Sequence, residues 1–327
     1  FNSTLKEYRT LPDEFIENFI LRQPSKDIMN QLQRTVLCLY TIDKNPDDTS
    51  LENLINQALH LIAKFPSLLV YSYHAVNHKH FKQSFIIHNP VKEYSIAQNI
   101  LHMLRPDSSF TALEAEILDL ILLIHAEHGG GNNSTFTSHV VSSTGTDTYS
   151  SVSASIGSLK GPLHGGANCM VSNMIEDIKK NCSYTNEEFL KEYIRKIFMG
   201  EAFDGSGKVY GMGHAIYTLS DPRAVILKKK AYELAKEKGQ LEEFELFSNV
   251  EKFTKEIGKE LKGENFEICA NVDLYSGFVY KLLNIPTNIF TPLFALARIA
   301  SWNAHRIEQI TSDRKIIRPA YKAIDVH

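Results

Sequence analysis

The chain has 327 residues, of which 43% are hydrophobic and 22% are charged, and its formal net charge is -3 at pH 7. This is the composition of an ordinary globular protein, long enough for one large domain or two lobes. It lacks the basic excess of nucleic-acid-binding proteins and any apolar run long enough to cross a bilayer. We therefore expect no nucleic-acid partner and no membrane.

The four cysteines stand at positions 38, 169, 182 and 269 and form no C-x-x-C pair. This spacing predicts buried or free thiols, and neither a disulfide framework nor a zinc site. Such thiols are typical of a reducing compartment, and we expect a cytoplasmic protein.

Helical patterns dominate the chain. The first long one covers residues 48–66 and is expected to end at Pro66. The clearest covers residues 110–131, where Thr111 and Glu114 have the spacing of a capping box and three glycines follow the last turn. Apolar residues surround most of that helix, which predicts that it is buried on all sides.

Further helices are expected over residues 183–200, 220–239 and 286–310. In the second of these, Ser220 is a candidate N-cap, and Pro222 falls in the first turn. Residues 84–91 and 264–274 are short possible strands. The patterns together predict a mostly α fold, with glycine-dense breaks at 160–168 and 205–213 as lobe edges or hinges.

One histidine has unusual neighbours, because His164 in the stretch GPLHGGAN is flanked by a proline and three glycines. Glycine permits a close backbone approach and proline fixes a bend, so the imidazole is held on a contorted segment. Taken alone, the stretch is equally consistent with a turn that happens to contain a histidine.

The thirteen histidines raise the question of a metal site, with His125, His128, His164 and His214 as candidate ligands. An H-E-x-x-H motif is absent, and Cys169 lies at no recognised ligand spacing. We expect no metal, and His125 is better interpreted as a buried structural histidine. His128 is placed at the C-terminal end of a buried helix, where the helix dipole favours the protonated ring. A protonated histidine at this position either binds a carboxylate ligand or caps the helix without any ligand.

Two further segments carry candidate groups. In GMGHAIYTLSDPRA, His214 follows two glycines, and Arg223 falls in the first turn of a helix, where an anion is favoured. The alternative is that Asp221 and Arg223 are a cap and a solvated charge. In NVDLYSG, Asp273 stands among apolar residues, which indicates either a paired structural carboxylate or a catalytic base.

The motifs GPLHGGAN, GMGHAIYTLSDPRA, NVDLYSG and ALARIASWNAHRIEQI, followed by RKIIRPAY, occur in this order, and the chain resembles the citrate synthase family over nearly its whole length. The resemblance implies an all-α, two-lobed fold. A large lobe would comprise residues 1–165 and 286–327, and a smaller lobe of residues 166–285 would be inserted into it. It also implies a homodimer.

The resemblance further implies roles for single residues. His164 is then the acid, Asp273 the base, and His214 the group that contacts the ketoacid. The substrate-binding residues are then His128, Arg223, Arg298 and Arg318, the last reaching the partner subunit's site. The implied reaction, a step of the tricarboxylic acid cycle, condenses acetyl-CoA with oxaloacetate and hydrolyses the thioester, with acetyl-CoA as a substrate and no cofactor.

Alternatives stay open at this point. A 2-methylcitrate synthase that uses propionyl-CoA would share every motif. A non-catalytic homologue that binds ketoacid or CoA, and a metal-dependent hydrolase, are less favoured. Two positions depart from the family pattern: Ala215 replaces a frequent arginine near the coenzyme, and Leu274 stands beside the base where Phe or Ala is frequent.

Overall fold

The computed structural model describes residues 2–214, 216–312 and 315–320. Over these residues the chain is helical, and its only β pairing is an isolated bridge between Met212 and Ala270. The predicted all-α fold is confirmed. The prediction of two short strands was wrong. Residues 84–91 have no regular structure, and residues 264–274 contribute only Ala270 to the bridge. Proline at position 90 removes a donor that a sheet would need.

The chain forms two compact units. Unit 1 comprises residues 1–108, 125–160 and 295–327, and unit 2 comprises residues 109–124 and 161–294. This division differs from the lobe boundaries that the resemblance implies, because residues 109–124 group with the second unit. The lobe boundaries stay a prediction.

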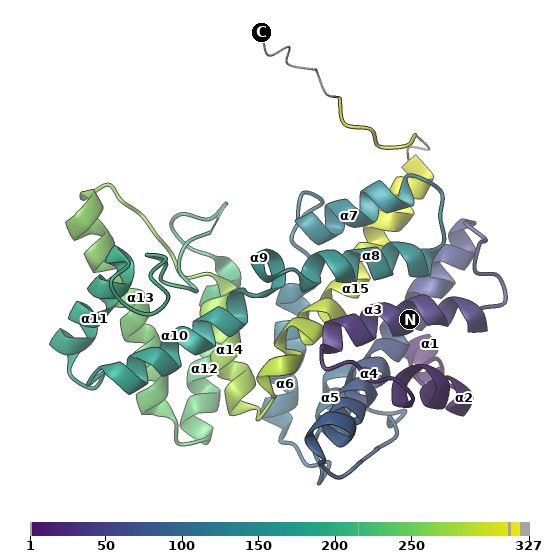
Figure 1. The fold of residues 1–327 in the computed structure, drawn as a ribbon, viewed down its shortest axis with the longest axis horizontal. Coiled ribbons are helices and arrows are strands. Elements are labelled where there is room, and N and C mark those ends of the chain that lie inside the picture. Colours follow the sequence, from purple (N-terminus) through teal and green to yellow (C-terminus); the bar gives the residue numbers. More distant parts are fainter. Residues whose placement is uncertain (1, 215, 313–314, 321–327) are drawn as a thin grey trace. The chain divides into compact units, whose positions relative to one another are not determined.

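Unit 1 is a group of helices that pack against one another (Figure 1). Helix α8 packs against α7 and α3, and α3 packs against α4, which in turn contacts α5. Its elements are α1 (Asn2–Glu7), α2 (Asp13–Phe15), the π-helix η1 (Ile16–Leu21), α3 (Ile28–Cys38), the 3-10 helix η2 (Leu39–Ile42), α4 (Leu51–Phe81), α5 (Ile96–Leu104), α7 (Asn133–Ser142) and α8 (Thr148–Lys160).

Unit 2 is built around α14, which packs against α10, α12 and α13, while α11 packs on α13. Its elements are α9 (Pro162–Gly165), α10 (Ala167–Asn181), α11 (Glu187–Met199), α12 (Pro222–Glu237), α13 (Leu241–Lys262), α14 (Val272–Leu282) and the 3-10 helix η3 (Thr287–Ile289). Two helices belong partly to each unit, namely α6 (Ala112–His125) and α15 (Phe290–Ser312).

Helix α4 continues through Pro66 to Phe81, so the predicted end at Pro66 was wrong. A proline inside a helix removes one hydrogen bond and crowds the preceding turn. Here the surrounding residues are fully buried, with Phe65, Leu68 and Leu69 all 0% exposed. Tertiary packing of this apolar stretch therefore outweighs the local cost of the proline.

Helix α6 begins with the predicted capping box. The Thr111 amide donates to Glu114 across 2.8 Å, and the Glu114 amide donates to the Thr111 hydroxyl across 3.2 Å. The helix is not buried on all sides as expected, because Leu123 is 71% exposed. Its last residue is His125, so His128 lies beyond the helix and does not share a helical face with His125.

The predicted caps of α11 and α12 have different outcomes. Helix α11 ends at Gly200, whose φ of 76° is the left-handed conformation of a C-cap. Helix α12 begins with Pro222 at its first position, as expected, but its N-cap is Asp221 and not Ser220. The Asp221 carboxylate accepts the Arg223 amide at 3.0 Å, a stronger interaction than a serine hydroxyl offers.

All four cysteines carry free thiols, so the expectation of no disulfide framework is confirmed. Among the described helices, none is both long and apolar enough to cross a membrane.

Candidate active site

The His164 segment is the single-turn helix α9 in unit 2, which Gly166 connects to α10. The His164 amide donates to the Gly161 carbonyl across 2.9 Å, and the Thr291 hydroxyl donates to the Gly165 carbonyl across 2.9 Å. A Cβ at Gly166 would stand 2.5 Å from the Pro162 carbonyl oxygen, so only glycine fits there. The glycines flanking His164 thus permit a backbone that presents a half-buried imidazole at a fixed place.

Asn168, in the same motif, connects α10 to α14. The Asn168 side-chain amide donates to the Ser276 hydroxyl across 2.6 Å, and both residues are buried. A Cβ at Gly277 would stand 2.5 Å from the Asn168 side-chain oxygen, so the two helices approach closely at this glycine. The turn that carries His164 is therefore tied to the helix that carries Asp273.

A second loop, residues 211–214, lies against the segment that precedes α14. The Gly213 amide donates to the Cys269 carbonyl at 2.7 Å, and the Asn271 amide donates to the Gly211 carbonyl at 2.9 Å. Gly211 has a φ of 83°, and a Cβ there would stand 2.9 Å from Leu274. Leu274 is fully buried beneath this loop.

His214 lies next to the only arginine of its motif. Its Nδ1 accepts the amides of Ile216 and Tyr217 at 3.0 and 3.1 Å, so the neutral ring carries its proton on Nε2. Nε2 lies 3.2 Å from Arg223 Nη2, and the guanidinium also donates to Asp221, whose side chain is 0% exposed.

Electrostatics keep His214 neutral. Burial lowers the pKa of His214, and the positive charge of Arg223 lowers it further, while Asp221 only partly opposes them. The pKa of Asp221 is itself low: its burial raises the pKa, but hydrogen bonding and the charge of Arg223 outweigh that effect. His214 and Arg223 thus form a pair of adjacent donors at the start of α12.

Asp273 occupies the first turn of α14 and is half-buried. Asn271 is the N-cap and accepts the Asp273 amide at 3.0 Å, and a helix N-terminus favours a carboxylate. Burial raises the pKa of the Cys169 thiol, and the negative charge of Asp273 raises it further. Burial and the charge of Asp273 also raise the pKa of the Tyr280 hydroxyl. The charge of Asp273 therefore acts on two neighbouring side chains, the Cys169 thiol and the Tyr280 hydroxyl.

In unit 1, Arg298 is a fully buried arginine on α15. Its Nε donates to the backbone carbonyl of His125, the last residue of α6, across 2.9 Å. His125 is itself buried, which confirms the structural interpretation of its position. Burial of a guanidinium is destabilising unless anions or carbonyls surround it. The role of Arg298 in binding a carboxylate stays a prediction.

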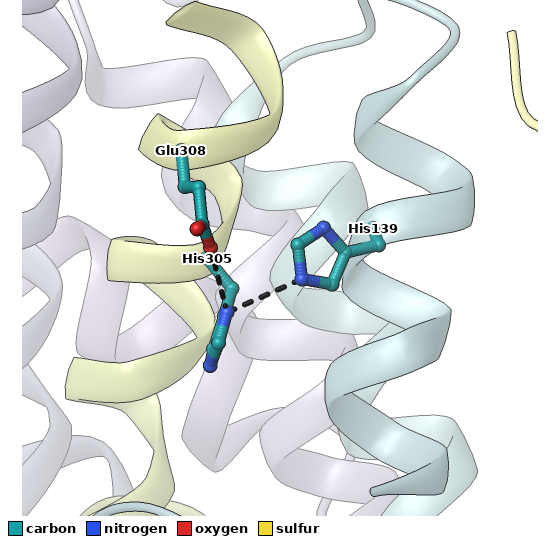
Figure 2. A group of neighbouring side chains, drawn as sticks. All are labelled: His139, His305 and Glu308. Carbon is teal, nitrogen blue, oxygen red and sulfur yellow. Dashed lines mark hydrogen bonds and ion pairs between the residues drawn. The ribbon is translucent and has the colours of Figure 1, made fainter. Parts of the chain in front are cut away.

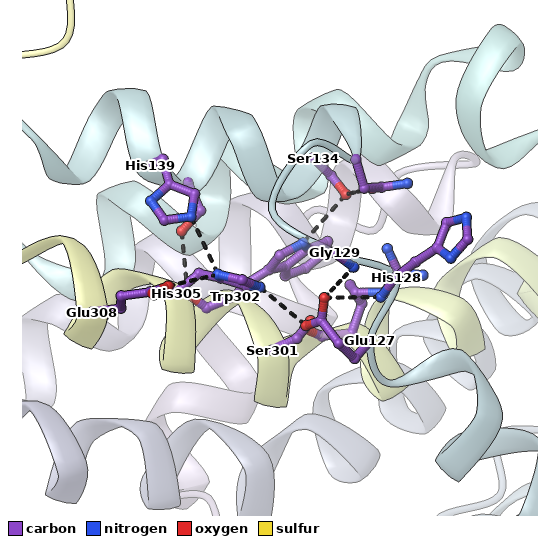
Figure 3. A network of polar contacts seen from close by, with 12 residues as sticks. Glu127, His128, Gly129, Ser134, His139, Ser301, Trp302, His305 and Glu308 are labelled. Atoms are coloured by element: carbon purple, nitrogen blue, oxygen red, sulfur yellow. Dashed lines mark hydrogen bonds and ion pairs between the residues drawn. The ribbon is translucent and has the colours of Figure 1, made fainter. Parts of the chain in front are cut away.

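His128 lies in the turn that follows α6. The Glu127 carboxylate accepts the backbone amides of His128 and Gly129, the first across 3.0 Å, as Figure 3 shows. Burial raises the pKa of Glu127, but hydrogen bonds from Gly129 and from His305 lower it overall. Glu127 therefore fixes the turn of His128, a role that no sequence pattern indicated.

Arg318 is exposed, and the neighbouring Ile317 amide donates to the Ser143 hydroxyl at 3.0 Å. Ala215 lies outside the described residues. Each unit therefore contributes part of the predicted set: His164, His214, Arg223 and Asp273 belong to unit 2, and His128, Arg298 and Arg318 belong to unit 1.

A family model for the C-terminal domain of citrate synthase matches residues 1–320. The chain belongs to the citrate synthase family. Among curated citrate synthases, that of Haloferax volcanii is 33% identical over 98% of this chain and 78% of its own length. The citrate synthase of Synechocystis is 38% identical over 82% of this chain and 61% of its own length.

Solved citrate synthase structures have the same fold. The Pyrobaculum aerophilum citrate synthase superposes with a TM-score of 0.82 at 28% identity, over 100% of this chain and 78% of that one. A complex of the Thermoplasma acidophilum citrate synthase with carboxymethyl coenzyme A and oxaloacetate gives a TM-score of 0.80 at 24% identity. A relative of different specificity, the 2-methylcitrate synthase of Shewanella oneidensis, is 34% identical over 81% of this chain and 64% of its own length.

Proposed function

We propose that this citrate synthase family member condenses acetyl-CoA with oxaloacetate and hydrolyses the resulting thioester to citrate and CoA. The observation that carries the proposal is the family match over residues 1–320, together with an acid, a base and arginines at the motif positions. The reaction requires no cofactor, because the thioester supplies the driving force.

The first step makes an enol from a very weak carbon acid. Asp273 takes a proton from the thioester methyl group while the His164 imidazole hydrogen-bonds the thioester oxygen, where negative charge develops. The tight turn at Gly166 and the Asn168–Ser276 hydrogen bond support this assignment, since both restrict the turn of His164 relative to α14.

The second step needs a polarised ketone and a fixed ketoacid. The neutral His214 ring donates from Nε2 to the ketone oxygen, and Arg223 beside it binds a carboxylate. Arg298 and His128 hold the second carboxylate, and this orientation supplies several kcal/mol of the barrier. Closure of the lobes excludes water until condensation is complete.

We further propose a homodimer in which Arg318 completes the partner subunit's site. One feature of the single chain supports it: the Arg318 side chain is exposed and so is accessible to a second subunit.

The second candidate is a 2-methylcitrate synthase that uses propionyl-CoA, favoured by the similarity to the Shewanella oneidensis enzyme. Steady-state kinetics with acetyl-CoA and propionyl-CoA, each with oxaloacetate, distinguish the two. We expect a higher kcat/KM for acetyl-CoA, and a preference for propionyl-CoA would establish the second candidate. In either case Asp273→Asn should lower kcat about 10²–10⁴-fold, as for a lost general base. Absence of turnover with both thioesters would reject both.

A further inference from the structure

A cluster of two histidines and a glutamate lies in unit 1 between α7 and α15, apart from the residues assigned above. His139 is on α7, and His305 and Glu308 are on α15 (Figure 2). In the described part of the chain, this is the group whose ligand atoms have metal-binding spacing, all within 4.8 Å of one another. None of the histidines weighed in the sequence analysis belongs to it.

The three side chains point electron pairs toward one place. His305 Nδ1 lies 3.2 Å from His139 Nε2 and 3.1 Å from a carboxylate oxygen of Glu308. When a zinc ion holds two nitrogens at about 2.0–2.1 Å in a tetrahedron, those nitrogens lie about 3.3 Å apart. The imidazole spacing in this protein therefore nearly equals the edge of a zinc tetrahedron.

The outer nitrogen of each ring faces an acceptor oxygen, to which it donates when it carries the ring proton. His139 Nδ1 lies 3.0 Å from the Gln309 side-chain oxygen, which only accepts. His305 Nε2 lies 3.2 Å from the Glu127 carboxylate (Figure 3). With one proton on each outer nitrogen, both inner nitrogens carry lone pairs. Metal-binding histidines are oriented in this same way, by a carbonyl or carboxylate on the far nitrogen.

Two lone pairs and a carboxylate that face one another repel unless a cation lies between them. A proton on His305 would relieve the repulsion, and so would a divalent metal. Two imidazoles and one carboxylate, with a further position open to water, form a ligand set that suits Zn²⁺. Glu308 is largely exposed, with 64% of its side chain accessible, so it can rotate to complete the site.

We propose that His139, His305 and Glu308 form a zinc-binding site, with Gln309 and Glu127 orienting the two imidazoles. The site goes beyond the proposed reaction, which uses no metal. Because Glu127 also accepts the His128 and Gly129 amides, the ion would be joined through one carboxylate to the turn that follows α6.

The test is calorimetric titration of the chelator-treated full chain with ZnCl₂ in a buffer that does not bind metals. We expect one ion per chain. His139→Gln and His305→Gln should abolish this binding, and Glu127→Gln should weaken it about 10–100-fold, as for lost orienting partners. His88→Gln removes a half-buried histidine outside the cluster and should bind zinc like the wild type.

Two further measurements test the same proposal. Glu308→Gln alters an exposed side chain, so it tests the site even if a histidine variant fails to fold by circular dichroism. Co²⁺ in place of Zn²⁺ should give the intense visible absorption of a tetrahedral ion, and the histidine variants should lack it. The proposal is overturned if the wild type takes up no zinc. Equal zinc affinity in the wild type, His139→Gln and Glu308→Gln would overturn it as well.

Discussion

His214 Nε2 and Arg223 Nη2 lie 3.2 Å apart, and both atoms carry hydrogen-bond donors when the histidine is neutral. Two donors side by side do not satisfy each other, whereas one ligand oxygen can accept from both. This geometry supports the proposed role of the pair in binding a ligand oxygen. The amides of Ile216 and Tyr217 fix which ring nitrogen of His214 carries the proton.

This relationship predicts how His214 titrates. Burial and the Arg223 charge hold its pKa below the ordinary value of 6.5, so the ring stays neutral as pH falls to that value and gains its proton only below it. Arg223→Gln should raise the pKa, and Asp221→Asn should lower it. Histidine ring NMR signals followed against pH measure both shifts. His74, in unit 1, should titrate identically in all variants.

If Arg223→Gln leaves the His214 titration unchanged, the charge of Arg223 does not act on this ring.

The buried arginine on α15 gives the second prediction. Arg298→Leu should weaken oxaloacetate binding by roughly 2–5 kcal/mol, because a carboxylate would lose a buried charged partner. The KM for the thioester should change far less. Ligand binding followed by calorimetry separates the two effects, and Arg298→Lys, which keeps the charge, should lose less.

Arg306 supplies the matched control, since it is also buried on α15 but donates to Thr148, Ser142 and the Thr146 carbonyl. Arg306→Leu should lower stability without lowering ketoacid affinity in the folded protein. Equal losses of ketoacid affinity in both variants would mean that Arg298 has only a structural role.

The shared site gives the third prediction. Asp273→Asn and Arg318→Leu proteins should each be inactive. After subunit exchange, half of the dimers are mixed, and one of their two sites carries neither defect if Arg318 acts on the partner. Activity should then return to roughly a quarter of the wild type. Mass spectrometry of differently labelled chains verifies the exchange, and exchange without recovery would show that Arg318 does not act in the partner's site.

The fourth prediction concerns acid stability of unit 2. Glu251 bonds Lys228, Lys255 and Tyr275 at 2.9, 2.6 and 2.7 Å. Burial of Glu251 raises its pKa. These hydrogen bonds have the larger combined effect and lower the pKa of Glu251 to about 2. The folded state therefore binds fewer protons than the unfolded state between pH 4.5 and pH 2. The stabilisation is present above pH 4.5 and is lost as pH falls through this range.

Glu251→Gln should lower the free energy of unfolding at pH 7 by about 2–3 kcal/mol, and this deficit should shrink as pH falls below 4.5. Urea denaturation followed by circular dichroism at several pH values measures it. Glu256→Gln alters a more exposed glutamate on the same helix, whose side chain is 41% accessible, and should cost little at any pH. A deficit that does not depend on pH would contradict the assigned cause.

Apolar periodicity was sufficient to predict the helical class and the positions of five helices, because the 3.6-residue repeat is a local property. These are α4, α6, α11, α12 and α15. The prediction failed where tertiary packing determines the local structure or the exposure of a side chain. Pro66 is a helix breaker by local rules, yet its buried neighbours carry α4 past it. Leu123 has the apolar character of a buried residue, yet it is exposed in the single chain.

The candidate catalytic residues came from motif resemblance, whereas the groups that orient them could not be predicted. Asn168 and Ser276 are ordinary polar residues 108 positions apart, and only the folded chain brings them into contact. The same limit applies to His139 and His305, which are 166 residues apart on two helices. No spacing rule connects ligands at such a separation.

Unit 1 is assembled from three stretches of chain, the last of which begins at residue 295. The single tryptophan, Trp302, is fully buried in this last stretch and donates from Nε1 to Ser134 across 3.2 Å. During synthesis at about 5–20 residues per second, roughly 7–27 s therefore pass between the end of the second stretch and the start of the third. The nascent chain is exposed to aggregation and chaperone binding during that interval, and tryptophan fluorescence reports the moment when it ends.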